Sequence, residues 1–111
     1  MVSVDTFRKL ATSFDEVEEL PHFDKTSFRI RKKIFSTLEV NRKRACLKFT
    51  ELQQADFTAY DSDIVYPVPG KWGKMGWTYF ELSKVPSAML KDALRISFQN
   101  IAPGKRKIKI R

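Results

Sequence analysis

The sequence predicts a two-layer α+β domain in which helices cover one face of an antiparallel five-stranded sheet. Apolar residues keep helical spacing near both ends of the 111-residue chain, and between them several short segments alternate apolar with polar residues. The expected order, α-β-β-β-α-β-β-α, lacks the strict strand-helix alternation of a parallel sheet. This length suits one domain with its own core. We expect residues 1–103 to form that domain, with 104–111 as a basic tail.

The first expected element is an amphipathic helix of about residues 4–13. Its apolar side chains fall at helical spacing, Ser3 can cap its first turn, and Asp5 complements the helix dipole. An acidic run and Pro21 then interrupt the pattern.

Three strands are expected next, as a meander. Alternation of apolar and polar residues predicts strands at residues 27–31, 34–38 and 44–49, joined by turns at Lys32-Lys33 and at 41–43.

A short second helix, of about residues 51–59, is predicted by a capping box. Thr50 and Gln53 stand at the spacing in which each side chain bonds the other's backbone N–H. We expect this helix to present Leu52 and Ala55 to the core.

Two more strands and a final helix complete the domain. Residues 64–68 predict a strand whose Pro67 favours the edge of the sheet. A glycine-rich loop leads into the fifth strand at 77–82. Helical spacing then continues from Pro86, which suits a first helical turn, to Ile101.

The charge is strongly positive and unevenly placed. The net charge is +8, and residues 27–49 together with the last eight residues carry most of the excess of bases. A basic surface attracts polyanions, of which nucleic acid is the usual one. We expect the tail to act as an arm that adds phosphate contacts, to keep the protein in solution, or to add an edge strand through its alternating Lys-Ile-Lys-Ile.

The sequence contains one cysteine, Cys46, which excludes an intramolecular disulfide and fits a reducing compartment. No run of residues approaches the roughly 20 apolar residues of a membrane span. We therefore expect a cytoplasmic protein that does not bind membranes.

Several segments together are typical of one known family. They are Phe7-Arg8-Lys9-Leu10, Glu18-Glu19-x-Pro21-His22-Phe23, Ser27-Phe28-Arg29, Lys33-Ile34-Phe35-Ser36, Ala45-Cys46-Leu47-Lys48, Val68-Pro69-Gly70-Lys71-Trp72-Gly73-Lys74-x-Gly76-Trp77 and Ile101-Ala102-Pro103. Jointly they resemble the MmcQ/YjbR family, often described as DNA-binding-like. The resemblance implies a fold similar to secretion-chaperone-like and CyaY-like domains, and a "double-wing" comparison with nucleic-acid binders. Lys32 and Gly76 depart from the glycine and the histidine that many members have there, so any role of that histidine does not carry over.

Cations and aromatic residues are expected on the open face of the sheet. If alternate residues face the helices, Arg29, Arg31, Arg44 and Lys48 face outward, and Trp77 and Tyr79 lie on the same side. Aromatic rings can stack on bases while the cations hold phosphates. The alternative is that the rings are packing residues and the bases form a solvated face.

The leading hypothesis is therefore a non-enzymatic domain that binds DNA or RNA weakly and with low specificity. The residues expected to contact nucleic acid are Arg29, Arg31, Lys32, Lys33, Arg44, Lys48, Lys71, Trp72, Lys74, Trp77, Tyr79, Lys105, Arg106 and Lys107. The other hypothesis is a protein-interaction module that uses the sheet or a helix to form a homodimer or to hold a protein partner.

Catalytic and metal chemistry find little support in the sequence. His22, the one histidine, is expected in a turn, and Cys46 alternates with core residues in a strand and is expected to be a structural thiol. One histidine and one cysteine cannot build an imidazole or thiolate metal cluster. We expect no catalytic residues, no metal and no cofactor.

Overall fold

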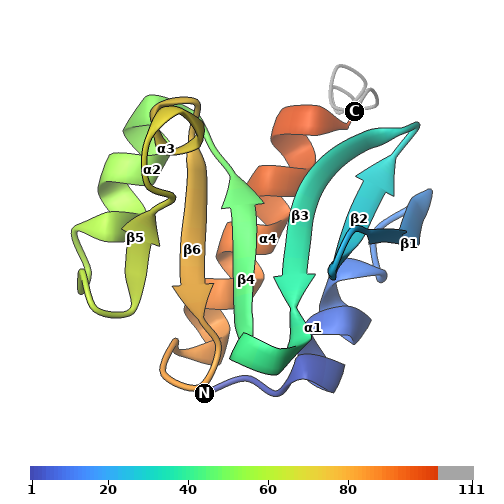
Figure 1. Cartoon of the computed structure of the whole chain (residues 1–111), viewed down its shortest axis with the longest axis horizontal. Coiled ribbons are helices and arrows are strands. Elements are labelled where there is room, and N and C mark those ends of the chain that lie inside the picture. Colours follow the sequence, from blue (N-terminus) through green and yellow to red (C-terminus); the bar gives the residue numbers. More distant parts are fainter. Residues whose placement is uncertain (103–111) are drawn as a thin grey trace.

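Six antiparallel strands form one sheet in the order β1-β2-β3-β4-β6-β5 (Figure 1). The computed structural model describes residues 1–102. The strands are β1 (Val17–His22), β2 (Lys25–Ile30), β3 (Lys33–Glu39), β4 (Arg44–Lys48), β5 (Val65–Pro67) and β6 (Trp77–Glu81), and the helices are α1 (Val4–Ala11), α2 (Glu51–Thr58), α3 (Lys71–Lys74) and α4 (Ser87–Ile101). None of these helices is long and apolar enough to cross a bilayer.

The predicted α+β class and antiparallel sheet are confirmed, but the predicted number of five strands is wrong. The additional strand is β1, which pairs with β2 from Val17 opposite Ile30 to His22 opposite Lys25. The sequence does not predict β1, because most of its side chains are exposed and Pro21 lies within it. A strand at the edge of a sheet tolerates proline and charge, so it shows no apolar alternation.

The predicted helices near residues 4–13, 51–59 and 86–101 are present as α1, α2 and α4, and the capping box of Thr50 and Gln53 is present as predicted. The expected packing of α2 is wrong, because Leu52 is 79 % exposed and Ala55 is also exposed. Phe57 provides the contact instead, since its ring packs on those of Phe49 and Phe80. Polar residues separate the apolar ones here, so the sequence did not indicate which side of α2 is buried.

The glycine-rich loop contains a short fourth helix, α3. Gly70, with a φ of +79°, leads into it, and the Lys74 N–H donates to the Gly70 carbonyl at 3.3 Å. Four residues with a glycine among them are too few to show helical periodicity, which explains why the sequence predicted a loop.

Helices α1, α2 and α4 cover one face of the sheet and leave the other face open (Figure 1). The core between these layers contains Phe7 of α1, Phe28 of β2 and Leu94 of α4, all fully buried. In β6, Thr78 and Phe80 face this core as the alternation predicts, and both are fully buried. Pro67 lies in β5, which is an edge strand as predicted.

Helix α4 is bonded to the sheet where the regular pairing of β3 is interrupted. The pairing of β2 with β3 shifts register between Phe28 and Arg29. Nearby, the buried Ser97 hydroxyl accepts from the Lys48 N–H at 3.1 Å and lies 2.9 Å from the Phe35 carbonyl and 2.8 Å from the Lys48 carbonyl. Ser97 therefore satisfies strand backbone groups that the β3–β4 ladder does not reach.

Gly76 allows a close approach between the end of β4 and the start of β6. Its φ is +104°, and its carbonyl accepts from the Phe49 N–H at 3.0 Å. A Cβ at this position would lie 1.9 Å from the Phe49 carbonyl oxygen. The position therefore requires glycine both for its backbone conformation and for space.

We expect the substitution Gly76→Ala to lower the free energy of unfolding by roughly 3–5 kcal/mol, because it combines backbone strain with a clash against Phe49. Urea denaturation followed by circular dichroism would measure this loss. Gly70→Ala is the matched control, since Gly70 also has a positive φ but no atom lies within 4 Å of the position that a methyl group would take there. It should cost about 1–2 kcal/mol, and equal losses in the two variants would contradict the close approach.

We expect Ser97→Ala to cost about 1–3 kcal/mol of stability, because it leaves the partly buried Lys48 N–H without its acceptor. The Lys48 amide should also exchange its hydrogen faster. Ser83→Ala, at an exposed position, serves as the control and should change stability by less than about 0.5 kcal/mol. A Ser97→Ala variant as stable as this control would show that the hydroxyl bridge is dispensable.

Candidate functional site

The open face of the sheet brings cations and aromatic rings together. In the register of β4 with β6, Lys48 lies opposite Trp77, and Cys46 lies opposite Tyr79. The Lys48 ammonium is 5.9 Å from the centre of the Trp77 ring. Arg44 lies at the other end of β4, on the same face, with its guanidinium 3.7 Å from the centre of the Tyr79 ring. Arg44, Lys48, Trp77 and Tyr79 thus share the face on which the alternation predicts them.

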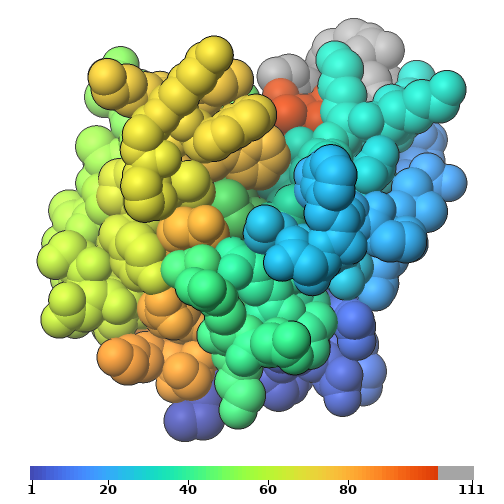
Figure 2. Space-filling view, in the orientation of Figure 1, coloured from blue at the N-terminus to red at the C-terminus, as the bar shows by residue number. Residues whose placement is uncertain are grey.

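A cavity of about 410 Å³ opens on this face. Its lining comes from β1, β2, β3, β4 and β6, from α3 and from the segment that precedes α3. The lining residues are His22, Lys25, Ile34, Thr37, Cys46, Val68, Trp72, Trp77 and Tyr79. Figure 2 looks onto the open face, with the residues around α3 (yellow) on one side and those of the β1–β2 hairpin (blue) on the other. The cavity lies between these two segments.

Arg44 is held by neighbouring side chains and is not available as an independent cation. Its guanidinium donates to both carboxylate oxygens of Glu39, at 3.0 to 3.2 Å, and to the Tyr66 hydroxyl at 3.3 Å. Burial alone would lower the pKa of Arg44, but the hydrogen bonds to Glu39 and Tyr66 and the charge of Glu39 raise it above its ordinary value. Arg44 therefore holds the Tyr79 ring in place more than it offers charge to a ligand.

Tyr66 extends this network to Glu81. Its hydroxyl donates to the Glu81 carboxylate, and burial together with that hydrogen bond raises the pKa of Tyr66. The hydrogen-bonded network of Glu39, Arg44, Tyr66 and Glu81 thus occupies one end of the open face, with the Arg44 charge paired to Glu39.

The other predicted cations are distributed around the opposite end of the sheet. Arg29 donates from Nε to the Ser27 hydroxyl at 2.9 Å, and Arg31 forms an ion pair with Glu16 at 3.2 Å. Arg31 and Lys32 have positive φ values and form the turn between β2 and β3, one residue earlier than the sequence predicted.

Lys32 is exposed in this turn and Lys33 is exposed at the start of β3, and Lys71 and Lys74 are exposed on α3. Trp72, also on α3, is 58 % exposed. Figure 1 shows α3 and the β2–β3 turn at the same end of the sheet. The remaining predicted residues, Lys105, Arg106 and Lys107, lie outside the described residues.

The sequence did not indicate that His22, Lys25 and Thr37 line the cavity. His22 is the last residue of β1 and lies opposite Lys25, whereas the sequence predicted a turn at His22. A prediction of β1 would have indicated the position of His22, because alternation along that strand places His22 on the open face. Cys46 is buried, and burial raises the pKa of its thiol to about 12, so the thiol stays protonated at neutral pH.

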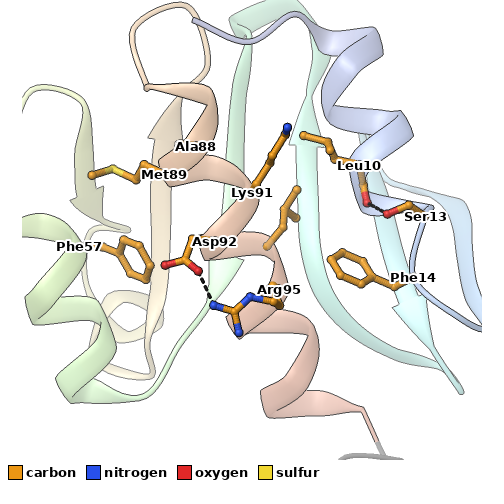
Figure 3. A pocket seen from close by; sticks show the side chains of 10 residues that line it. Leu10, Ser13, Phe14, Phe57, Ala88, Met89, Lys91, Asp92 and Arg95 are labelled. Carbon is orange, nitrogen blue, oxygen red and sulfur yellow. Dashed lines mark hydrogen bonds and ion pairs between the residues drawn. The ribbon is translucent and has the colours of Figure 1, made fainter.

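A second hollow, of about 720 Å³, lies on the helical side of the molecule (Figure 3). Leu10 and Phe14 line it beside α1, and Phe57 of α2 lies on the other side of α4. Asp92 and Arg95 of α4 form an ion pair between these apolar walls, each about half exposed. We call this hollow the α4 groove.

Within residues 1–102, no three His, Cys, Asp or Glu side chains gather closely enough to hold a metal ion. The open-face cavity instead offers aromatic walls, a neutral floor and, among its described lining residues, the Lys25 ammonium and the His22 imidazole. Such a surface can stack on planar rings and attract anions.

Comparison with known proteins identifies the fold. The crystal structure of Deinococcus radiodurans protein DR2400, which has a DUF419 domain, is similar with a TM-score of 0.80 and 18 % sequence identity. The match covers 100 % of this chain and 84 % of that chain, and it shows that the two share a fold. No curated protein matches the chain.

A family model described as YjbR matches residues 12–100, which is most of the chain. This match confirms the resemblance that the sequence motifs indicated. The chain belongs to the YjbR family.

Proposed function

We propose that this protein binds nucleic acid weakly and with low sequence specificity, through the open face of its sheet and through α3, and that it is not an enzyme. The observation that carries the proposal is the pairing of Lys48 with Trp77, which places a cation beside an indole on an uncovered face. Proteins that bind single strands combine such basic grooves with aromatic rings on which bases stack.

The cations best placed to contact phosphates are those without a carboxylate partner among the described residues. Arg29, Lys48, Lys71 and Lys74 form no ion pair within residues 1–102. Arg31 remains a candidate because its pair with Glu16 is exposed, and such surface pairs contribute little stability. We propose that Arg44 positions the Tyr79 ring and does not itself contact phosphate.

Two further elements of the proposal come from the sequence. The tail bases Lys105, Arg106 and Lys107 would add phosphate contacts, and Lys32 in the β2–β3 turn and Lys33 at the start of β3 would contribute others. A cytoplasmic location is consistent with Cys46, which is a free thiol.

The alternative function is formation of a homodimer, and the α4 groove is the observation that favours it. Its walls are apolar, and Asp92 and Arg95 lie between them, about half exposed (Figure 3). In a two-fold dimer with antiparallel α4 helices, Asp92 of each copy would face Arg95 of the other. The groove would then be covered by a second copy of this chain.

Nucleic-acid binding through the open face predicts a specific salt dependence. Replacement of Lys48 and Lys74 by glutamine should weaken binding of a labelled single-stranded oligonucleotide. The slope of log K against log salt should become shallower by about 1.4, because two phosphate contacts are lost. Fluorescence anisotropy across a range of salt would measure both effects.

The control for that experiment removes the same charge elsewhere. Lys84 and Lys91 are exposed, one after β6 and the other on α4. Their double replacement by glutamine should leave the slope nearly unchanged. If both double variants weaken binding equally, net charge alone explains the attraction and the open face is not the site.

The dimer alternative makes its own prediction. If α4 pairs with itself, the protein should have twice its monomer mass by light scattering, and Asp92→Arg should dissociate it by placing like charges in contact. The double variant Asp92→Arg with Arg95→Asp should restore the dimer. A monomeric mass at every concentration would refute this alternative.

A further inference from the structure

We propose that the open-face cavity receives one unpaired base of a nucleic acid, so that the protein prefers single strands to duplexes and also binds free nucleoside monophosphates. This inference rests on the proposed function and specifies the ligand of the same surface.

The size and walls of the cavity suit a planar ring. Its volume, about 410 Å³, lies within the roughly 300–1,000 Å³ of small-molecule sites. Trp72 stands on α3 at one side, and Trp77 and Tyr79 project from β6. Because Tyr79 is held by the Arg44 guanidinium at 3.7 Å, this wall is fixed before a ligand arrives. Trp72 is the exposed ring and the one best able to stack on an entering base.

The floor of the cavity is uncharged but retains hydrogen-bonding groups. Thr37 and Cys46 face each other across the β3–β4 pair, and Ile34 and Val68 are apolar. The Cys46 thiol is protonated because burial raises its pKa to about 12. The Thr37 hydroxyl can both donate to and accept from the edge of a base. A neutral heterocycle therefore fits this floor better than a charged group does.

The Lys25 ammonium in the lining suits the phosphate attached to such a base, and the His22 imidazole beside it can form a hydrogen bond. The described residues that line the cavity include Lys25 and His22 and no carboxylate. The described ion-pair partner of Lys25 is Asp24, at 3.8 Å, and the Asp24 side chain is 88 % exposed. That contact is weak and can be exchanged for a phosphate at low cost.

A hollow of this kind favours unpaired strands over duplexes. A base must leave its stack and its partner to enter a hollow, and a duplex resists this whereas an unpaired strand does not. Contacts to phosphate on a flat face would not make this distinction.

Titration of the full chain with four probes would test the inference: AMP, ribose 5-phosphate, a single-stranded oligonucleotide and a duplex of the same length. Trp72 and Trp77 are the two tryptophans of the chain and both line the cavity, so their indole N–H signals in NMR spectra report on it directly. AMP should shift both signals and ribose 5-phosphate should shift neither. The single strand should bind at least about tenfold more tightly than the duplex.

Three variants test whether AMP and single strands bind in the open-face cavity. Cys46→Phe fills the floor, and Trp72→Ala removes an exposed wall with little risk to the fold. Each should abolish the AMP shifts and reduce the preference for single strands to below about threefold. Tyr60→Ala removes an aromatic ring that is 51 % exposed and does not line the cavity, and it should behave like the original protein.

Equal affinity for single strand and duplex would overturn the inference and leave the proposed function standing. So would single-strand binding without any AMP-induced shift of the indole signals, or AMP shifts that persist in both Cys46→Phe and Trp72→Ala. Failure of every nucleic acid to bind would instead refute the proposed function on which the inference rests.

Discussion

The backbone at Lys48 and Phe49 is fixed from two sides, and the arrangement of the open face depends on this constraint. On the helical side, Ser97 of α4 bonds the N–H of Lys48 and lies within hydrogen-bond distance of its carbonyl. Gly76, which directly precedes β6, approaches the Phe49 carbonyl and accepts from the Phe49 N–H. With both peptide groups held, Lys48 is fixed on the open face of the sheet, opposite Trp77 in the pairing of β4 with β6.

Much of the open face could be predicted because period-two alternation needs only local sequence. Arg44 and Lys48 lie on one face of β4 because Ala45 and Leu47 are buried on the other. The capping box at Thr50 was equally local. By contrast, the partners of Arg44 come from β3, β5 and β6, and no sequence pattern connects Glu39 or Tyr66 to it.

The parts that could not be predicted are those in which tertiary contacts override local preference. β1 has little apolar alternation and exists because β2 offers it an open edge. His22 lies at the end of β1 and lines the cavity. Because the sequence does not predict β1, it also does not predict that His22 belongs to the candidate site. Net charge likewise did not indicate how many cations are available to bind a ligand. Arg44 is paired with Glu39 and Arg31 with Glu16, so a count of bases overstates what the surface can offer.

The strand order has a consequence for folding. Within residues 1–102, β4 with β6 is the one pair of neighbours that are not consecutive strands in the chain. The β1–β4 meander and the β5–β6 pair can each form from contacts close in sequence, and their association closes a longer loop. The pairing of β4 with β6 places Lys48 opposite Trp77 and Cys46 opposite Tyr79. The candidate site thus forms only when the β1–β4 meander and the β5–β6 pair associate. A ligand bound there would therefore stabilise the association of these two parts of the sheet.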